Sequence, residues 1–163
     1  MTSEGLSLAV FNDLPAATAE EALLACCSAP RWARVIAAAR PYSTRESLLA
    51  AADAALTTLD DDEIDEALAG HPRIGDRPTS AASAREQSGV AGADVRSALA
   101  EGNRAYEAKF GHIYLVCAAG RGGEELLAVL RARLDNDSAT ERQVMRTELA
   151  KINRLRLAGL VAP

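Results

Sequence analysis

The stretch His71-Pro72-Arg73-Ile74-Gly75 is the first place in the sequence where chemistry is expected. A rigid proline turn directly after a helix end holds an imidazole at a fixed angle, and histidine is the side chain that exchanges protons near neutral pH. A histidine just past a helix C-terminus is also a common capping cation. Spacing alone favours the cap, so a catalytic role for His71 needs support from elsewhere in the chain.

Ser83, Glu86 and Gln87 form a second candidate group. Their offsets of three and four residues place a hydroxyl, a carboxylate and an amide on one face of a helix. Together they would line a polar pocket. The simpler alternative is a solvated helix face, and three common polar residues do not by themselves exclude it.

Arg156 is the third candidate, because it falls at an apolar position of the last expected helix. A guanidinium turned toward a core is costly unless an anion meets it, which predicts a buried carboxylate or a substrate carboxylate as its partner. The alternative is an arginine at the edge of the stripe with its charged end in water. The two alternatives stay open. The stripe consists of Met145, Leu149, Ile152, Arg156 and Leu160.

The run Ile113-Tyr114-Leu115-Val116-Cys117 is a fourth candidate, of a different kind. It is short, apolar and rich in residues that favour extended structure, in a chain otherwise poor in strands. Without a full sheet, its backbone N–H and C=O groups need other partners, and a flat, amide-rich ligand would supply them. A buried core segment is the alternative, which periodicity does not exclude.

Helices must position these candidates. The chain has 163 residues, of which 48% are hydrophobic and only 4% aromatic, and its alanine clusters favour helix. The patterning predicts an all-α, compact, single-domain bundle spanning residues 1–163, with about eight helices after a short lead-in. The helices are expected near residues 15–27, 32–39, 43–59, 60–69, 80–87, 94–110, 124–134 and 140–160.

Charge and cysteine content narrow the class of protein. A formal net charge of -5 argues against nucleic acid and against an anionic membrane surface as partners. No window approaches the length of a membrane span. The three cysteines do not form a secreted disulfide framework, and neither they nor the two histidines have the spacing of a metal site. These features predict a cytoplasmic protein without a bound metal.

Taken together, several blocks resemble the family of 2-oxo-4-hydroxy-4-carboxy-5-ureidoimidazoline (OHCU) decarboxylases, and the resemblance covers nearly the whole chain. The order of the blocks is more specific than any one of them. They are residues 22–27 with Arg31-Trp32-Ala33, residues 39–42, residues 71–76, Ser83 with Glu86-Gln87, residues 106–111, the run through Cys117, residues 133–136 and residues 151–157.

The resemblance implies a helical fold and assigns roles to the candidates. His71 takes the position of the family's catalytic histidine, and Glu86 that of its acidic partner. Substrate-binding positions match Pro72, Ser83, Gln87 and Arg156, and the segment whose main chain contacts the ureide matches Tyr114, Leu115 and Val116. The family needs no metal or organic cofactor, which agrees with a sequence that has no motif for one.

The implied function is decarboxylation of a small-molecule ureide to (S)-allantoin during urate degradation. A homodimer and functional coupling to the preceding hydrolase of the pathway are left open. The alternative from another class is a helical protein-interaction module without catalytic activity, in which His71 is a cap and Arg156 part of a structural ion pair. A hydrolase of another ureide is a second enzymatic alternative.

Overall fold

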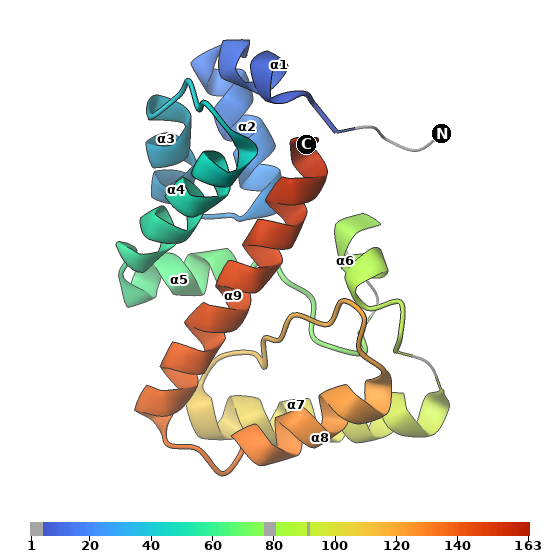
Figure 1. Cartoon of the computed structure of the whole chain (residues 1–163). Coiled ribbons are helices and arrows are strands. Elements are labelled where there is room, and N and C mark those ends of the chain that lie inside the picture. Colours follow the sequence, from blue (N-terminus) through green and yellow to red (C-terminus); the bar gives the residue numbers. More distant parts are fainter. Residues whose placement is uncertain (1–4, 77–80, 91) are drawn as a thin grey trace. The chain divides into compact units, whose positions relative to one another are not determined.

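The structure, a computed structural model, describes residues 5–76, 81–90 and 92–163, and within that part the chain is helical without strands (Figure 1). The all-α prediction is confirmed. The described residues form nine helices: α1 (Leu8–Asp13), α2 (Ala16–Cys26), α3 (Pro30–Ala38), α4 (Arg45–Thr57), α5 (Asp61–Leu68), α6 (Ala81–Glu86), α7 (Ala93–Phe110), α8 (Gly123–Arg133) and α9 (Ser138–Leu160).

The chain divides into two compact units, one formed by residues 1–70 with 150–163 and the other by residues 71–149. The boundary falls directly before His71 and again within α9. The prediction of one domain over residues 1–163 stays a prediction. None of the described helices combines the length and apolar content needed to cross a membrane.

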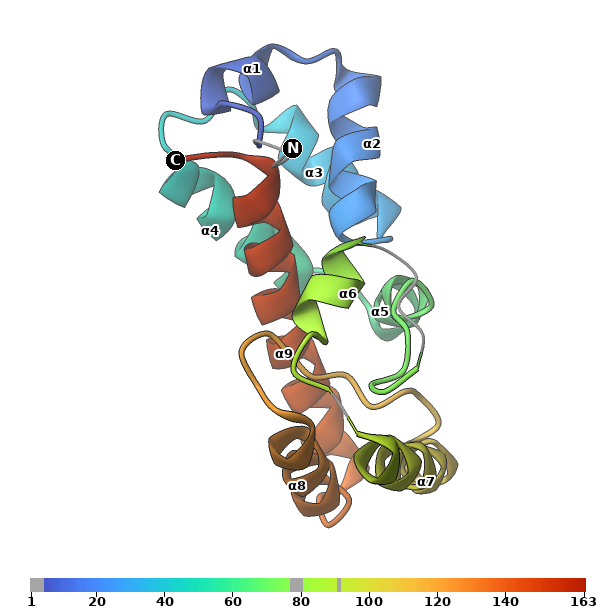
Figure 2. The ribbon, with the colours of Figure 1, turned by 90° about the vertical axis from the view of Figure 1, so that its right-hand side faces the viewer.

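In the first unit, α2 packs on α3 and α3 on α4 (Figure 2). Two predicted helix starts, near residues 43 and 60, are confirmed, and a side chain caps each of these helices. The Thr44 hydroxyl accepts the backbone N–H of Ser47 at 3.0 Å, and the Asp60 carboxylate accepts that of Glu63 at 2.8 Å. Both residues form capping boxes, which satisfy N–H groups that the first helical turn leaves without partners. Local chemistry therefore sets where α4 and α5 begin.

The first unit also joins the two ends of the described chain. The backbone N–H of Leu6 donates to the Leu160 carbonyl at 2.7 Å, and the N–H of Ala162 donates to the Leu6 carbonyl at 2.7 Å. These bonds form an isolated parallel bridge between Leu6 and Val161. The segment before residue 15, expected as a lead-in, contains the short helix α1, whose N-terminus is capped by Ser7.

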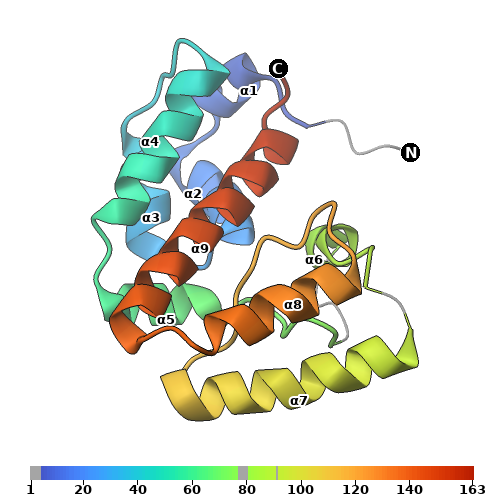
Figure 3. The same cartoon turned by 60° about the horizontal axis from the view of Figure 1, so that its bottom comes forward.

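In the second unit, α7 and α8 lie side by side (Figure 3). Gly102 lets them approach, because a Cβ there would lie 2.5 Å from the Leu130 side chain. The predicted apolar run between them lies outside any helix or strand, in residues 113–118. The core of this unit consists of Ile74, Val90, Leu99, Tyr106, Tyr114, Val116, Ala118, Leu126 and Leu130.

Candidate functional site

His71 and Pro72 lie in the loop that follows α5, and both are half-buried. Helix α7 holds this loop through a buried hydrogen bond, in which the Asn103 amide donates to the Ile74 carbonyl at 2.9 Å. Ile74 itself belongs to the core, with 5% of its surface exposed. The residues that follow His71 are therefore fixed by packing and by a hydrogen bond, although the loop has no regular structure.

Gly75 and Gln87 connect this loop to the region of α6. The backbone N–H of Gly75 donates to Oε1 of Gln87 at 3.0 Å. Gly75 has a φ of 93°, a left-handed conformation that glycine adopts without the steric cost of a side chain. Gln87, predicted to bind substrate, thus has a structural contact of its own, which brings the His71 loop next to the Glu86-Gln87 pair.

An ion pair fixes the loop at a third point. Nε of Arg73 lies 2.9 Å and 3.1 Å from the two carboxylate oxygens of Glu107. Glu107 follows Asn103 by four residues, so the two side chains lie on one face of α7. Two positions of one helix and Gln87 together hold residues 73–75.

Glu86, the predicted acidic partner, is the last residue of α6 and is half-buried. Burial raises the pKa of the Cys117 thiol at the end of the apolar run, and the negative charges of Glu148 and Glu86 raise it further. Ser83 lies within α6, but its side chain is outside the described residues. The second unit therefore brings together the His71 loop, Glu86, Gln87 and the run that ends at Cys117.

Tyr114, Leu115 and Val116 are buried, with 1%, 3% and 2% of their surfaces exposed. The Tyr114 hydroxyl donates to the Leu126 carbonyl at 3.0 Å, and the Leu115 carbonyl accepts from Arg133 at 2.7 Å. Among the described residues, no hydrogen bond reaches the N–H or C=O of Tyr114 and Val116, or the N–H of Leu115. Buried main-chain groups without partners are rare, so this segment has unused capacity for a ligand or water.

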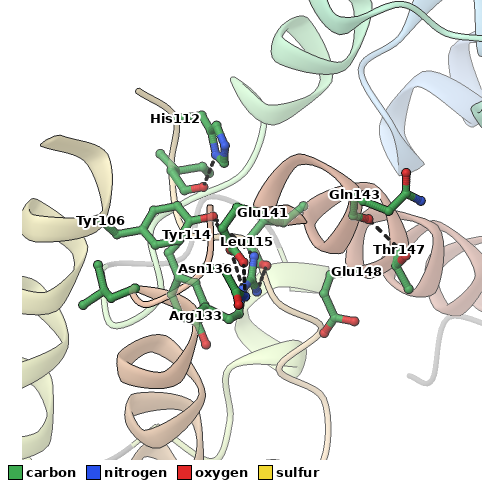
Figure 4. A network of polar contacts seen from close by, with 12 residues as sticks. Tyr106, His112, Tyr114, Leu115, Arg133, Asn136, Glu141, Gln143, Thr147 and Glu148 are labelled. Atoms are coloured by element: carbon green, nitrogen blue, oxygen red, sulfur yellow. Dashed lines mark hydrogen bonds and ion pairs between the residues drawn. The ribbon is translucent and has the colours of Figure 1, made fainter. Parts of the chain in front are cut away.

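A buried ion pair lies beside this segment (Figure 4). Nε of Arg133 is 2.6 Å from Oε1 of Glu141, and the two side chains are 7% and 0% exposed. The Tyr106 hydroxyl donates to the same carboxylate oxygen at 2.6 Å, and the Asn136 amide donates to the other at 3.0 Å. Burial raises the pKa of Tyr106, and its hydrogen bond to Glu141 raises it further. The phenol therefore stays a donor at neutral pH.

Arg156 belongs to the first unit, near the end of α9, and is half-buried. Its Nη1 donates to the Cys26 carbonyl at 3.2 Å. This contact tests neither alternative for Arg156, so a role in binding a carboxylate stays a prediction. Burial raises the pKa of the Cys26 thiol and of the Cys27 thiol to about 11, so both are protonated at neutral pH.

Several residues that hold the site had no role assigned from the sequence, although Glu107 and Arg133 lie within blocks of the resemblance. Asn103 and Glu107 show helical spacing but carry residue types common on solvated faces. Arg133 and Glu141 belong to different helices, so no local pattern connects them. Within the described residues, no group of three or more His, Cys, Asp or Glu side chains is arranged to hold a metal ion.

Comparisons with known proteins agree on one family. A family model described as OHCU decarboxylase matches residues 12–158. The uric acid degradation bifunctional protein TTL of Arabidopsis thaliana is 31% identical over 145 residues, which are 83% of this chain and 45% of that protein. The 2-oxo-4-hydroxy-4-carboxy-5-ureidoimidazoline decarboxylase of Amia calva is 39% identical over 59 residues, 36% of this chain and 34% of that protein. The matches span less than half the length of either curated relative.

Solved structures give the same result. A crystal structure of OHCU decarboxylase in the presence of (S)-allantoin matches with a TM-score of 0.78 and 29% identity, over 86% of this chain and 96% of that one. An (S)-allantoin synthase structure matches with a TM-score of 0.77 over 96% of this chain and 54% of that one, and at 17% identity it supports the fold alone. On the breadth of the family match, the chain belongs to the OHCU decarboxylase family.

Proposed function

We propose that the protein decarboxylates 2-oxo-4-hydroxy-4-carboxy-5-ureidoimidazoline to (S)-allantoin. The observation that carries the proposal is the buried main chain of Tyr114–Val116, whose N–H and C=O groups, except the Leu115 carbonyl, lack partners in the described part of the chain. A ureide offers a matching row of N–H and C=O groups. The charge of Glu86 acts on Cys117, the residue after this segment, and Gln87 holds the loop that carries His71.

The substrate supplies its own electron sink, so the chain's task is to bind, orient and move protons. The carbon that bears the carboxylate also bears a hydroxyl and adjoins a C=N bond. When the bond to the carboxylate breaks, its electron pair forms a C=C bond, and the C=N nitrogen takes a proton. The resulting enol then loses its hydroxyl proton while the neighbouring carbon is protonated on one face, which gives the (S) product.

Within this scheme, His71 hydrogen-bonds the substrate hydroxyl and manages its proton, and Glu86 orients the histidine or the substrate. Pro72, Ser83 and Gln87 contact the substrate with the main chain of Tyr114–Val116. Arg156 binds an anionic end of the substrate. Each of these roles rests on the family resemblance and on the contacts described above.

The proposal also covers the partners of the enzyme and its cellular compartment. A plant relative is named a bifunctional protein of uric acid degradation, which supports functional coupling to the preceding hydrolase. Three free cysteines fit a reducing cytoplasm. Homodimerisation stays a prediction.

To test this, the unstable substrate is generated in the assay mixture from urate, with urate oxidase and the preceding hydrolase. Circular dichroism then follows the appearance of (S)-allantoin, with and without this protein, while released carbon dioxide is measured in parallel. We expect faster formation of the (S) enantiomer with one carbon dioxide per product, unchanged after dialysis against EDTA. No acceleration would favour the interaction-module alternative, and a product formed without carbon dioxide would favour a different ureide hydrolase.

A further inference from the structure

Two buried side chains hold the main chain of the Tyr114–Val116 segment from one side. Nη1 of Arg133 donates to the Leu115 carbonyl at 2.7 Å, and Oε1 of Glu148 accepts the backbone N–H of Cys117 at 3.3 Å. The exposed fractions of Arg133 and Glu148 are 6% and 5%. Figure 4 shows the Arg133 side chain beside Tyr114 and Leu115. The two anchored groups flank Val116.

The guanidinium of Arg133 is itself held in one orientation. Its Nε lies 2.6 Å from Glu141, whose carboxylate also accepts from Tyr106 and Asn136. The centre of the guanidinium lies 4.9 Å from the ring centroid of Tyr114, within the range of a cation–π contact. A guanidinium with fixed N–H directions gives the Leu115 carbonyl a fixed direction in turn.

Peptide geometry transmits these anchors to Val116. The peptide bonds on both sides of Val116 are trans, and in a planar trans peptide the C=O of one residue and the N–H of the next point in opposite directions. Holding the Leu115 carbonyl therefore directs the Val116 N–H away from Arg133. Holding the Cys117 N–H directs the Val116 carbonyl away from Glu148. Neither group of Val116 has a hydrogen-bond partner among the described residues.

We propose that Arg133 and Glu148 are positioning residues that direct the N–H and C=O of Val116 toward the ureido or ring amide of the ligand. The ligand then exchanges two hydrogen bonds with one residue, as two residues do in a hydrogen-bonded antiparallel pair. This inference rests on the proposed function, because it assumes a ligand that carries adjacent N–H and C=O groups. It gives the buried ion pair a role other than stability, since apolar residues in its place often stabilise a protein equally well.

The test uses (S)-allantoin, the stable product, as the probe. Arg133→Lys keeps a cation opposite Glu141 but loses the planar fork that reaches both partners. Glu148→Leu removes the acceptor of the Cys117 N–H, and Glu148→Gln retains an acceptor oxygen. We expect the dissociation constant of (S)-allantoin and the KM to rise about tenfold in Arg133→Lys and Glu148→Leu, with a smaller change in kcat. Glu148→Gln should bind within about threefold of wild type.

A matched control separates positioning from stability. Leu130→Ala truncates a buried side chain one turn before Arg133 on α8, so it should lower the melting temperature while leaving the dissociation constant near that of wild type. In 15N-labelled wild-type protein, the Val116 amide resonance should shift strongly when (S)-allantoin is added. The Cys117 amide, bonded to Glu148, should shift less.

The outcomes separate two failures. If wild type neither binds (S)-allantoin nor forms it, the proposed function and this inference fall together. If wild type binds and turns over, three results overturn the inference alone: wild-type affinity in Arg133→Lys and Glu148→Leu, equal weakening in Leu130→Ala, or an unmoved Val116 amide. Weak binding by Glu148→Gln as well as Glu148→Leu would also count against it, because an acceptor oxygen would then not be what matters.

Discussion

At the scale of single residues, the two histidines of the chain have different surroundings. His71 lies in the loop clamped by α7 and Gln87, whereas His112 lies 5.5 Å from the ring centroid of Tyr106 and 6.3 Å from that of Phe110. Nδ1 of His112 is 3.0 Å from the Ile113 carbonyl. The protein thus contains its own comparison between a histidine proposed for chemistry and one engaged in packing.

His71→Asn should reduce turnover by roughly 100-fold to 10,000-fold, because asparagine forms hydrogen bonds but does not transfer a proton near neutral pH. The fold should survive, since His71 lies in a loop. Initial rates of (S)-allantoin formation and thermal melting are measured side by side, with His112→Asn as the control. A helix cap would instead contribute only about 1 kcal/mol or less to stability. Normal rates with a lowered melting temperature would therefore refute the catalytic role.

Arg156→Met should lower kcat/KM by at least about tenfold, because it removes a cation proposed to bind the substrate carboxylate while keeping an unbranched side chain. The control is Arg154→Met, two residues earlier on the same helix. Arg154 pairs with Glu46 and Asp53, and 43% of its side chain is exposed, so its loss should cost little. Steady-state kinetics and melting curves of the two variants distinguish a loss of substrate binding from a loss of stability. Full activity in Arg156→Met would return this arginine to a structural role.

At the scale of elements, the described part of the loop after α5, residues 71–76, depends on a few contacts rather than on regular structure. Residues 73–75 are held by the Asn103 amide, the Glu107 carboxylate and the Gln87 amide. The rigidity expected of a catalytic loop therefore comes from the neighbouring helix α7 and from Gln87. Changes in this loop should affect stability and turnover together.

Gly75→Ala tests that coupling, because the φ of 93° is unfavourable for any residue with a Cβ. The strain should cost about 1–2 kcal/mol of unfolding free energy. It should also reduce turnover, since relief of the strain would move His71. Gly159→Ala is the control: its added Cβ meets nothing within 4 Å, and helical alanine is preferred over glycine. Urea denaturation and initial rates are compared, and an unstrained, fully active Gly75→Ala protein would contradict the expectation.

The sequence was most informative about elements whose ends are set by neighbouring residues. The helices expected near residues 43–59 and 60–69 are confirmed, and the side chains of Thr44 and Asp60 cap them. The helix α1 was missed because six residues give too short a period to recognise. In the site, the loop at His71 was visible from proline and glycine alone. The contact between Arg133 and the Leu115 carbonyl was not visible from the sequence, because the fold brings together two residues that are 18 positions apart.

At the scale of the whole molecule, two buried thiols should make the free energy of unfolding fall as the pH becomes alkaline. Burial raises the pKa of Cys26 and of Cys27 from the usual 9.0 to about 11. A group whose pKa is raised in the folded state contributes stability that is fully present below its unfolded pKa. That contribution is lost as pH rises through the folded pKa, here between about pH 9 and pH 11.

Wild type should therefore lose roughly 2–3 kcal/mol more unfolding free energy than Cys26→Ala/Cys27→Ala when the pH rises from about 8 to about 10. Urea denaturation at several pH values measures the difference. The double variant should be less stable at neutral pH, because it loses buried volume, yet keep most of its turnover, since the mechanism needs no thiolate. Parallel pH curves for the two proteins would show that these thiols do not set the alkaline limit.

The bridge between Leu6 and Val161 has a consequence for how the protein is engineered. Leu6 uses both of its backbone hydrogen-bonding groups there, so a protein cut after Leu160 would lose the Ala162 N–H that pairs with the Leu6 carbonyl. We expect such a truncation to loosen the segment before α1 as well as the end of α9, although the two are far apart in the sequence.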